Sequence, residues 1–146
     1  MNFLDSLDIS STGLSAQRTR MNLISSNLAN VNTTRTENGE PYKRKDVVFE
    51  AHQDHDFEDV LNERLEASVD GVKVAEIIED DKPFIEKYEP GHPDADENGY
   101  VRLPNVNLVE EMVNMISASR SFEANAKAVS ATKDMAGAAL RIGETS

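Results

Sequence analysis

Apolar and small side chains recur at intervals of four and three residues over the stretch 107–142. This alternation is typical of a heptad seam and predicts one long helix that packs along another helix. The positions in the series are Leu108, Met112, Met115, Ser119, Phe122, Ala126, Val129, Ala136 and Leu140, and Lys133 is the one charged residue at a seam position.

Both ends of this helix carry local signals. Asn107 occupies the expected N-cap, and Glu110 follows three residues later as in a capping box. Pro104 stops a helix upstream, and Gly143 follows the expected end. At about 1.5 Å per residue the helix would be roughly 50 Å long, so it needs a partner to cover its apolar face.

The N-terminal segment repeats the same period and predicts a second helix over residues 3–31. Its seam consists of Phe3, Leu7, Leu14, Met21, Ile24, Leu28 and Val31, with Ser10 and Gln17 at the two weaker positions. The run from Ser10 to Gly13 contains poor helix formers, so we expect a break or kink near Gly13. The two seams are expected to pack together as a coiled-coil pair.

The segment between the two helices shows short signals for turns and strands. A turn is expected at Asn38-Gly39, a strand at residues 47–49 and another at residues 83–88. An Asp-Gly turn at residues 70–71 predicts a hairpin over residues 65–78, pairing Val69 with Val72 and Ala67 with Val74. Residues 50–62 are expected to form a loop or a marginal turn of helix, and residues 100–103 are expected to be extended.

The sequence therefore predicts an α+β fold with a discontinuous helical domain. Residues 1–34 and 105–146 would form the terminal coiled-coil domain, and residues 35–104 would form a small β-rich insertion. The chain has 146 residues, 5% aromatic residues, no Trp and no Cys, which suits elongated helices with a small core. No stretch approaches the roughly 20 apolar residues of a membrane span, and we expect no cleaved signal peptide.

The net charge of −12 is concentrated in the middle of the chain. Residues 1–45 carry four acidic and six basic residues, residues 46–99 carry eighteen acidic and four basic residues, and the remainder is balanced. A nucleic-acid-binding protein needs a basic face, so this distribution argues against that class. The acidic segment is interpreted as a solvated surface.

Two groups of residues could in principle bind a metal. Asp94, Asp96, Asn98 and Gly99 match the first half of a calcium loop, but Asn105 stands where the final Glu belongs, so turn chemistry is favoured. The group His52, Asp54, His55 and Asp56 lacks a helical pattern and is interpreted as a solvated loop.

No arrangement of residues typical of catalysis is found. The chain has no glycine-rich phosphate loop and no nucleophile elbow, and its histidines are His52, His55 and His92. We therefore predict that the protein is not an enzyme and that it needs no cofactor.

The C-terminal seam has more apolar surface than one partner helix can cover. Val109, Val113 and Ile116 form a second row beside it. The Met residues could alternatively mark an adaptable peptide groove, but ordinary coiled-coil packing is favoured. More than one neighbour is expected for this helix.

Two stretches resemble signatures of the bacterial flagellar rod and hook proteins. The first is the run SSNLANVNT at residues 25–33. The second is GHPDADENGYVRLPNVN at residues 91–107 followed by EEMV at residues 110–113, which is similar to the proximal rod subunits of this family. The resemblance covers nearly all of residues 1–45 and 83–146.

This resemblance implies a structural role. Its family members are exported unfolded through the flagellar type III apparatus and assemble through their terminal helices into the rod. That rod crosses the periplasm and transmits motor torque. The implied location is the basal body, and the implied partners are further copies of the chain and other rod proteins, without nucleic acid or membrane insertion. The alternative reading is a calcium-responsive binding module that uses the Asp94–Gly99 loop.

The residues expected at the assembly interface share either a seam position or a place in the first signature. They are Leu7, Leu14, Met21, Ile24, Asn27, Leu28, Asn30, Val31, Asn32, Leu108, Val109, Met112, Val113, Met115, Ile116, Phe122, Val129 and Ala136.

Overall fold

The computed structural model describes residues 3–52 and 71–144. The described elements follow the order α1 (Phe3–Ala29), β1 (Lys45–His52), β2 (Gly71–Glu79), β3 (Ile85–Tyr88), β4 (Tyr100–Leu103) and α3 (Leu108–Glu144). Two long terminal helices thus enclose a β-rich middle, which confirms the predicted α+β fold class.

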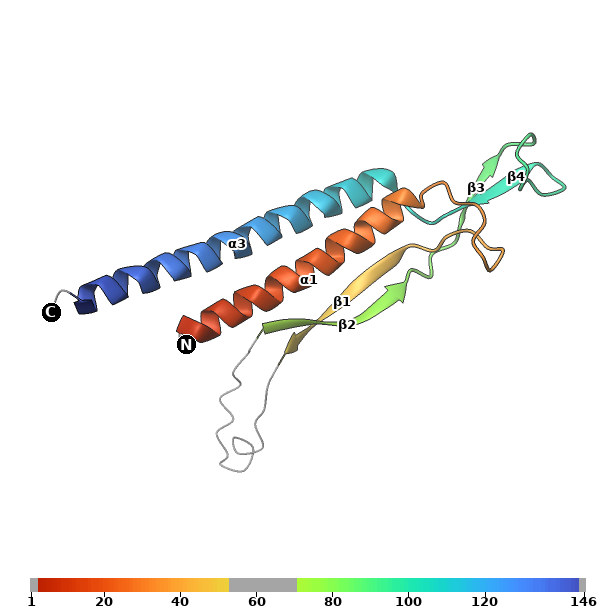
Figure 1. Cartoon of the computed structure of the whole chain (residues 1–146). Helices are drawn as coiled ribbons and strands as arrows, with labels where there is room; N and C mark the ends of the chain where they lie inside the picture. Colours follow the sequence, from red (N-terminus) through yellow and green to blue (C-terminus); the bar gives the residue numbers. More distant parts are fainter. Residues whose placement is uncertain (1–2, 53–70, 145–146) are drawn as a thin grey trace, which may run out of the picture.

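The elements are arranged around α1 (Figure 1). α1 runs antiparallel to α3 on one side, and the strand pair β1–β2 packs against it on another. The hairpin β3–β4 projects beyond the end of the helices where α1 stops and α3 starts. Within the described ranges, α1 is the one element that packs along α3.

The exposure pattern of α1 reflects this central position. A narrow stripe of exposed residues runs along the helix at intervals of three and four, formed by Asp8, Ser11, Ser15, Arg18, Asn22, Ser25 and Ala29. Most positions between them are buried or half-buried, because two different neighbours cover the remaining surface. The predicted heptad seam accounts for the packing of α1 on α3 but not for its packing on β1 and β2.

The expected break at Gly13 is wrong, because α1 is continuous from Phe3 to Ala29. The small residues here allow close packing on two sides. A Cβ atom added to Gly13 would lie 2.8 Å from the side-chain nitrogen of Asn125 in α3. On the other side, a Cβ atom on Gly71 would lie 2.2 Å from Oγ1 of Thr12, and the backbone N–H of Val72 donates to that oxygen at 3.2 Å.

The end of α1 and the start of α3, which lie side by side, are both capped by asparagine. The side-chain oxygen of Asn107 accepts hydrogen bonds from the N–H groups of Val109 at 3.0 Å and Glu110 at 3.3 Å, which confirms the N-cap of α3. At the end of α1, Nδ2 of Asn30 donates to the carbonyl of Ser26 at 2.9 Å. This bond satisfies one of the carbonyl groups that a helix end leaves free.

The face that α3 turns toward α1 is only partly the predicted seam. Met115, Phe122, Val129 and Ala136 are half-buried, as expected. Ser119 is half-buried as well, whereas Leu108, Met112, Ala126, Lys133 and Leu140 are exposed. On the inner face, Glu111, Asn125 and Thr132 stand one residue before the exposed Met112, Ala126 and Lys133, and Ala118 is buried beside Ser119.

The reason for this shift is that polar side chains with satisfied hydrogen bonds occupy the inner face. Glu111 is fully buried and accepts hydrogen bonds from Asn27 and Arg44. Thr132 is buried and donates to the carbonyl of Ala128 at 2.7 Å. A pattern of apolar residues alone omits such positions, so it placed one row of the seam at Met112 and Ala126, one residue away from Glu111 and Asn125.

The strands form two separate antiparallel pairs. β1 pairs with β2 from Lys45 opposite Glu79 to His52 opposite Gly71, with an irregularity between Val48 and Phe49. β3 pairs with β4. The strands expected near residues 47–49 and 83–88 and the extended run 100–103 are thereby confirmed.

The expected hairpin over residues 65–78 is described only in its second half. Residues 65–70, including Val69 and Ala67, lie outside the described residues. The described half pairs with β1, with Val72 opposite Ala51 and Val74 opposite Phe49. Residues 50–52, which were expected in a loop, belong to β1.

Candidate functional site

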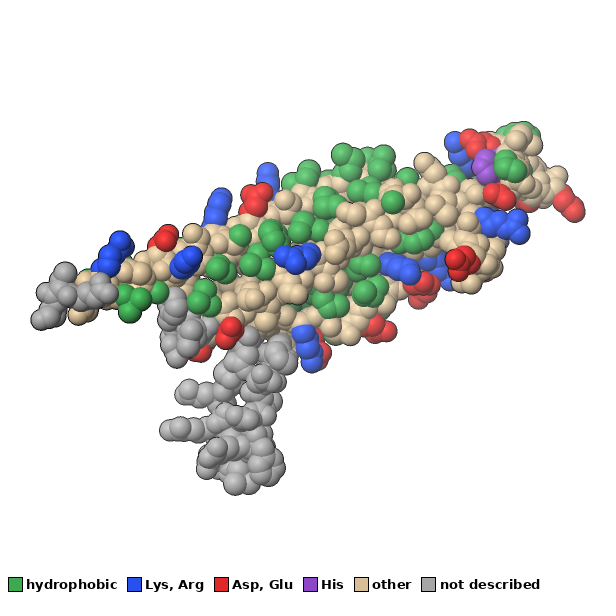
Figure 2. Space-filling view, in the orientation of Figure 1, with side chains coloured by type: hydrophobic (Ala, Val, Ile, Leu, Met, Phe, Trp, Pro, Cys, Tyr) green, Lys and Arg blue, Asp and Glu red, His purple; other side chains and the backbone are tan. Residues whose placement is uncertain are grey.

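The first half of α3 carries a row of apolar side chains that point away from the rest of the chain. We call Leu108, Val109, Met112, Val113 and Ile116 the outer row; their exposed fractions lie between 50% and 69%. Figure 2 shows hydrophobic side chains gathered over this half of the helix. A contiguous exposed apolar surface of this kind is typical of an interaction site.

The geometry of the helix pair explains why the outer row is uncovered. The inner face of α3 packs on α1 through Glu111, Met115 and Ala118, and the outer row lies to the side of these residues. α1 is too narrow to cover both faces of α3. The predicted excess of apolar surface at Val109, Val113 and Ile116 is therefore present, and it is joined by Leu108 and Met112.

The other predicted interface residues lie in different environments. Ile24 and Asn27 are buried inside the subunit, with exposed fractions of 4% and 0%. Asn32 is exposed. The half-buried residues are Leu7, Leu14, Met21, Leu28, Asn30 and Val31 of the N-terminal segment and Met115, Phe122, Val129 and Ala136 of α3.

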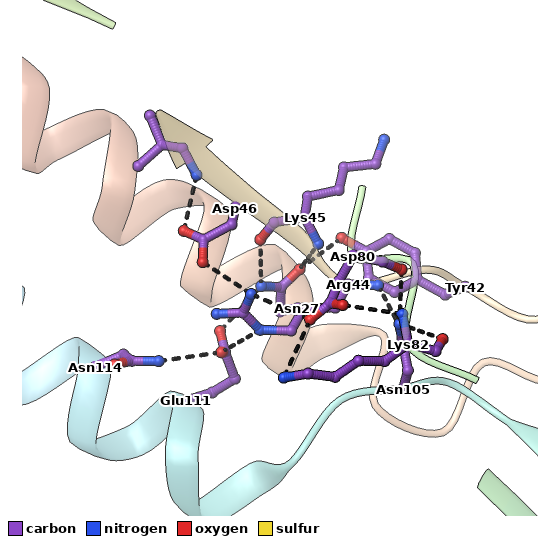
Figure 3. A network of polar contacts seen from close by, with 11 residues as sticks. Asn27, Tyr42, Arg44, Lys45, Asp46, Asp80, Lys82, Asn105, Glu111 and Asn114 are labelled. Carbon is purple, nitrogen blue, oxygen red and sulfur yellow. Dashed lines mark hydrogen bonds and ion pairs between the residues drawn. The ribbon is translucent and has the colours of Figure 1, made fainter. Parts of the chain in front are cut away.

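A buried polar network joins α1, α3 and the start of β1 (Figure 3). Asn27 lies at its centre. Its Nδ2 donates to the carbonyl of Lys45 at 2.8 Å and to Oε2 of Glu111 at 2.9 Å, and its Oδ1 accepts from the Tyr42 hydroxyl at 2.9 Å and from the N–H of Lys45 at 3.0 Å. Both donors and both lone pairs of the amide are thus used.

The Arg44 side chain provides the positive charge of the network. Its Nε donates to Oε1 of Glu111 at 2.9 Å, and its guanidinium also contacts Asp46 at 2.9 Å. Burial alone would lower the pKa of Arg44, but hydrogen bonds to Asp46 and Glu111 raise it above the ordinary value. Burial alone would likewise raise the pKa of Asp46, which the hydrogen bonds from Arg44 and the Val47 N–H hold below its usual value.

Asn105 extends the network to the strand that leads into α3. Its Oδ1 accepts from the Arg44 N–H at 2.8 Å, and its Nδ2 donates to the carbonyls of Asp80 at 2.9 Å and Lys82 at 3.1 Å. The side chain therefore ties together the chain segments before β1, after β2 and before α3. Three regions far apart in the sequence meet at this point.

The sequence reasoning did not identify Arg44, Glu111 or Asn105 as functional candidates. Glu111 was missed because the seam was traced through apolar residues. A carboxylate at a heptad core position next to an Asn-rich helix end is the signal that could have indicated a buried polar contact.

The residues of the proposed calcium loop form a turn. Oδ1 of Asp96 accepts hydrogen bonds from the N–H groups of Asn98 at 2.9 Å and Tyr100 at 2.8 Å. Asp94 accepts from the Thr34 hydroxyl at 2.7 Å. The carboxylates are thus bound to the protein itself, as expected for turn residues.

Metal and membrane chemistry find no support in the described part of the chain. Across residues 3–52 and 71–144, no three His, Cys, Asp or Glu side chains are grouped so as to hold a metal ion. Asp54, His55 and Asp56 lie outside the described residues. The helices of the described ranges include none that is long and apolar enough to cross a membrane.

Comparison with known proteins identifies the same family at both ends of the chain. Residues 7–35 match the family model described as "Flagella basal body rod protein", and residues 97–142 match "Flagellar basal body rod FlgEFG protein C-terminal". The chain is 45% identical to the flagellar basal-body rod protein FlgC of Borreliella burgdorferi over 97% of its length and 98% of the relative. It is 46% identical to FlgC of Bacillus subtilis, covering 99% of the chain and all of the relative, and 42% identical to FlgC of Escherichia coli O157:H7 with the same coverage.

Proposed function

The chain belongs to the FlgC family of flagellar basal-body rod proteins, and we propose that it joins its neighbours in the proximal rod through the outer row of α3. It is a structural subunit of the flagellar basal body, and its partners are other rod components. The family follows from the similarity to the relatives, and the proposed assembly surface is the exposed outer row.

The observation that carries this proposal is the outer row itself. Five large apolar side chains stay at least half exposed over the first nine residues of α3, although the helix already has one partner. Covering such a surface with a neighbouring subunit removes apolar area from water at about 25 cal/mol per Å². When a surface binds a different surface on the next copy and the rotation does not close into a ring, the result is an open helical array, which suits a rod.

The physical character of the subunit bears on how it reaches the rod. Among the residues that the structure describes, the buried apolar side chains are few, namely Ala16, Ile24, Val101, Val106 and Ala118. A weakly stable chain is easily kept unfolded for passage through the type III export apparatus, and it gains stability on assembly. We include export by that route, a place in the periplasmic part of the rod and torque transmission in the proposal.

The test replaces Val109 and Met112 by Asp. Both residues are exposed, so the variant is expected to keep the secondary structure and urea midpoint of the parent, within about 0.5 kcal/mol. In a strain lacking its own copy, it is expected to abolish rod assembly in isolated basal bodies and swimming in soft agar. Ala131→Asp, exposed on the far half of the same helix, serves as the matched control and should support assembly.

A second variant shows what loss of assembly through misfolding looks like, for comparison with the Val109 and Met112 double variant. Met115→Asp places a charge on the half-buried inner face, so folding and assembly should both fail. If the Val109 and Met112 double variant built rods and swam like the parent, the outer row would not be the assembly surface.

A further inference from the structure

We propose that the buried contact of Glu111 with Asn27 and Arg44 fixes the register of α3 along α1. The three side chains come from α3, from α1 and from the residue before β1. Their role in this proposal is to position the two helices against each other, which is separate from any contribution to assembly.

The helix pair has few other features that select one register. Gly13 lies against Asn125 and Asn27 lies against Glu111, so the two contacts are two heptads apart on both helices. Between and beyond them, the inner face of α3 presents Ala118 and Thr132 and the half-buried apolar row Met115, Phe122, Val129 and Ala136. Each of these two rows repeats at heptad spacing, so a shift of one heptad again brings apolar or small side chains against α1.

The polar contact would penalise such a shift strongly. Moving α3 by seven residues in one direction would place Ala118 opposite Asn27 and carry Glu111 about 10 Å along the axis. The carboxylate of Glu111, which has no exposed surface, would lose the hydrogen bonds that it accepts from Asn27 and Arg44 and would keep the 3.3 Å hydrogen bond from Asn114 on its own helix. A buried carboxylate without its positively charged partner is far more costly than a loosely packed alanine.

A contact that selects the helix register differs in its effects from a contact that only stabilises the folded state. Replacing a buried ion pair by apolar side chains of similar volume is often neutral or stabilising, whereas removing one partner alone is destabilising. A pair that selects the register should therefore be replaceable without loss of the folded state, but the replaced protein should no longer hold a single register. A pair that merely stabilises the fold would show no such effect.

The experiment measures the register directly in the purified full-length chain. The protein has no Cys, so Ser15→Cys and Glu123→Cys can carry spin labels at two exposed positions that lie level with each other on the two helices. Double electron–electron resonance spectroscopy then gives the distance distribution between the two spin labels. The buffer contains an osmolyte, which stabilises the folded state. The tested variant is Arg44→Met/Glu111→Leu, and Lys43→Met/Glu110→Leu is the matched control, with the same charge types changed at adjacent positions.

The expected result is one narrow distance in the parent and in the control. The Arg44→Met/Glu111→Leu variant should show at least one further population, displaced by about 10 Å along the helix axis, with helical content by circular dichroism unchanged. The single variant Arg44→Met should have a lower urea midpoint than this double variant. One narrow distance in the double variant, or a broad distribution in the parent, would overturn the proposal.

Discussion

At the scale of single residues, Asn27 shows how one side chain can serve several elements. Its amide bonds the backbone of Lys45 through both of its polar atoms, and it also contacts Tyr42 and Glu111. The residue belongs to the signature at residues 25–33 through which the chain resembles its family. Its place in the structure indicates that this part of the signature serves the folding of the subunit.

We expect Asn27→Ala to lower the free energy of unfolding by about 3 kcal/mol or more. The change leaves buried groups of Lys45 and Glu111 without a hydrogen-bond partner, and each such group costs about 1–3 kcal/mol. Urea unfolding followed by circular dichroism measures the effect. Asn22→Ala is the control, because Asn22 is exposed on the same helix and its loss should change stability by less than about 0.5 kcal/mol. Equal midpoints for the two variants would contradict the role assigned to Asn27.

At the scale of elements, the helix glycines Gly13 and Gly137 have different surroundings. Gly13 in α1 lies against Asn125, whereas nothing lies within 4 Å of a Cβ atom added to Gly137 in α3. Glycine in a helix interior is less favourable than alanine by about 1 kcal/mol. The space around each glycine therefore decides whether its replacement by alanine increases the stability of the protein.

Gly137→Ala is expected to raise the free energy of unfolding by about 0.5–1 kcal/mol, because the new methyl group meets open space. Gly13→Ala should gain less, since its methyl group must displace the Asn125 amide. Thermal unfolding of both variants beside the parent provides the comparison. A larger gain from Gly13→Ala than from Gly137→Ala would show that α1 and α3 do not pack closely at this point.

At the scale of the whole molecule, the interactions that hold the chain together gather near one end. The polar network and the buried residues Val101, Val106 and Ile24 lie where α1 ends and α3 begins. The opposite end consists of the helix termini, where Leu140 and Ile142 are exposed. We expect the subunit in solution to be ordered at the network and frayed at the helix termini.

Amide hydrogen exchange of the purified, dilute monomer tests this expectation. Slow exchange is expected near Asn27, Lys45 and Val106, and fast exchange in the first two turns of α1 and the last three turns of α3. Incorporation into a rod should slow exchange at both termini. Equally slow exchange along the whole of α1 and α3 in the monomer would contradict it.

Much of the fold follows from local features of the chain. The apolar period and the N-cap at Asn107 are properties of neighbouring residues, so the positions of both helices could be predicted from sequence. The same holds for the excess of apolar residues at Val109, Val113 and Ile116. Together with the two signatures, these features identified the fold class and the family.

The tertiary structure decided what depends on residues far apart in the chain. It determined that β2 pairs with β1, that Gly13 permits close helix packing, and that Glu111 rather than Met112 faces α1. A buried carboxylate is stable only where distant donors meet it, here Asn27 and Arg44, and no local pattern shows that meeting. For this reason the sequence by itself determined where the helices lie along the chain. Which residues of α1 and α3 face each other was determined only by the three-dimensional arrangement of their polar partners.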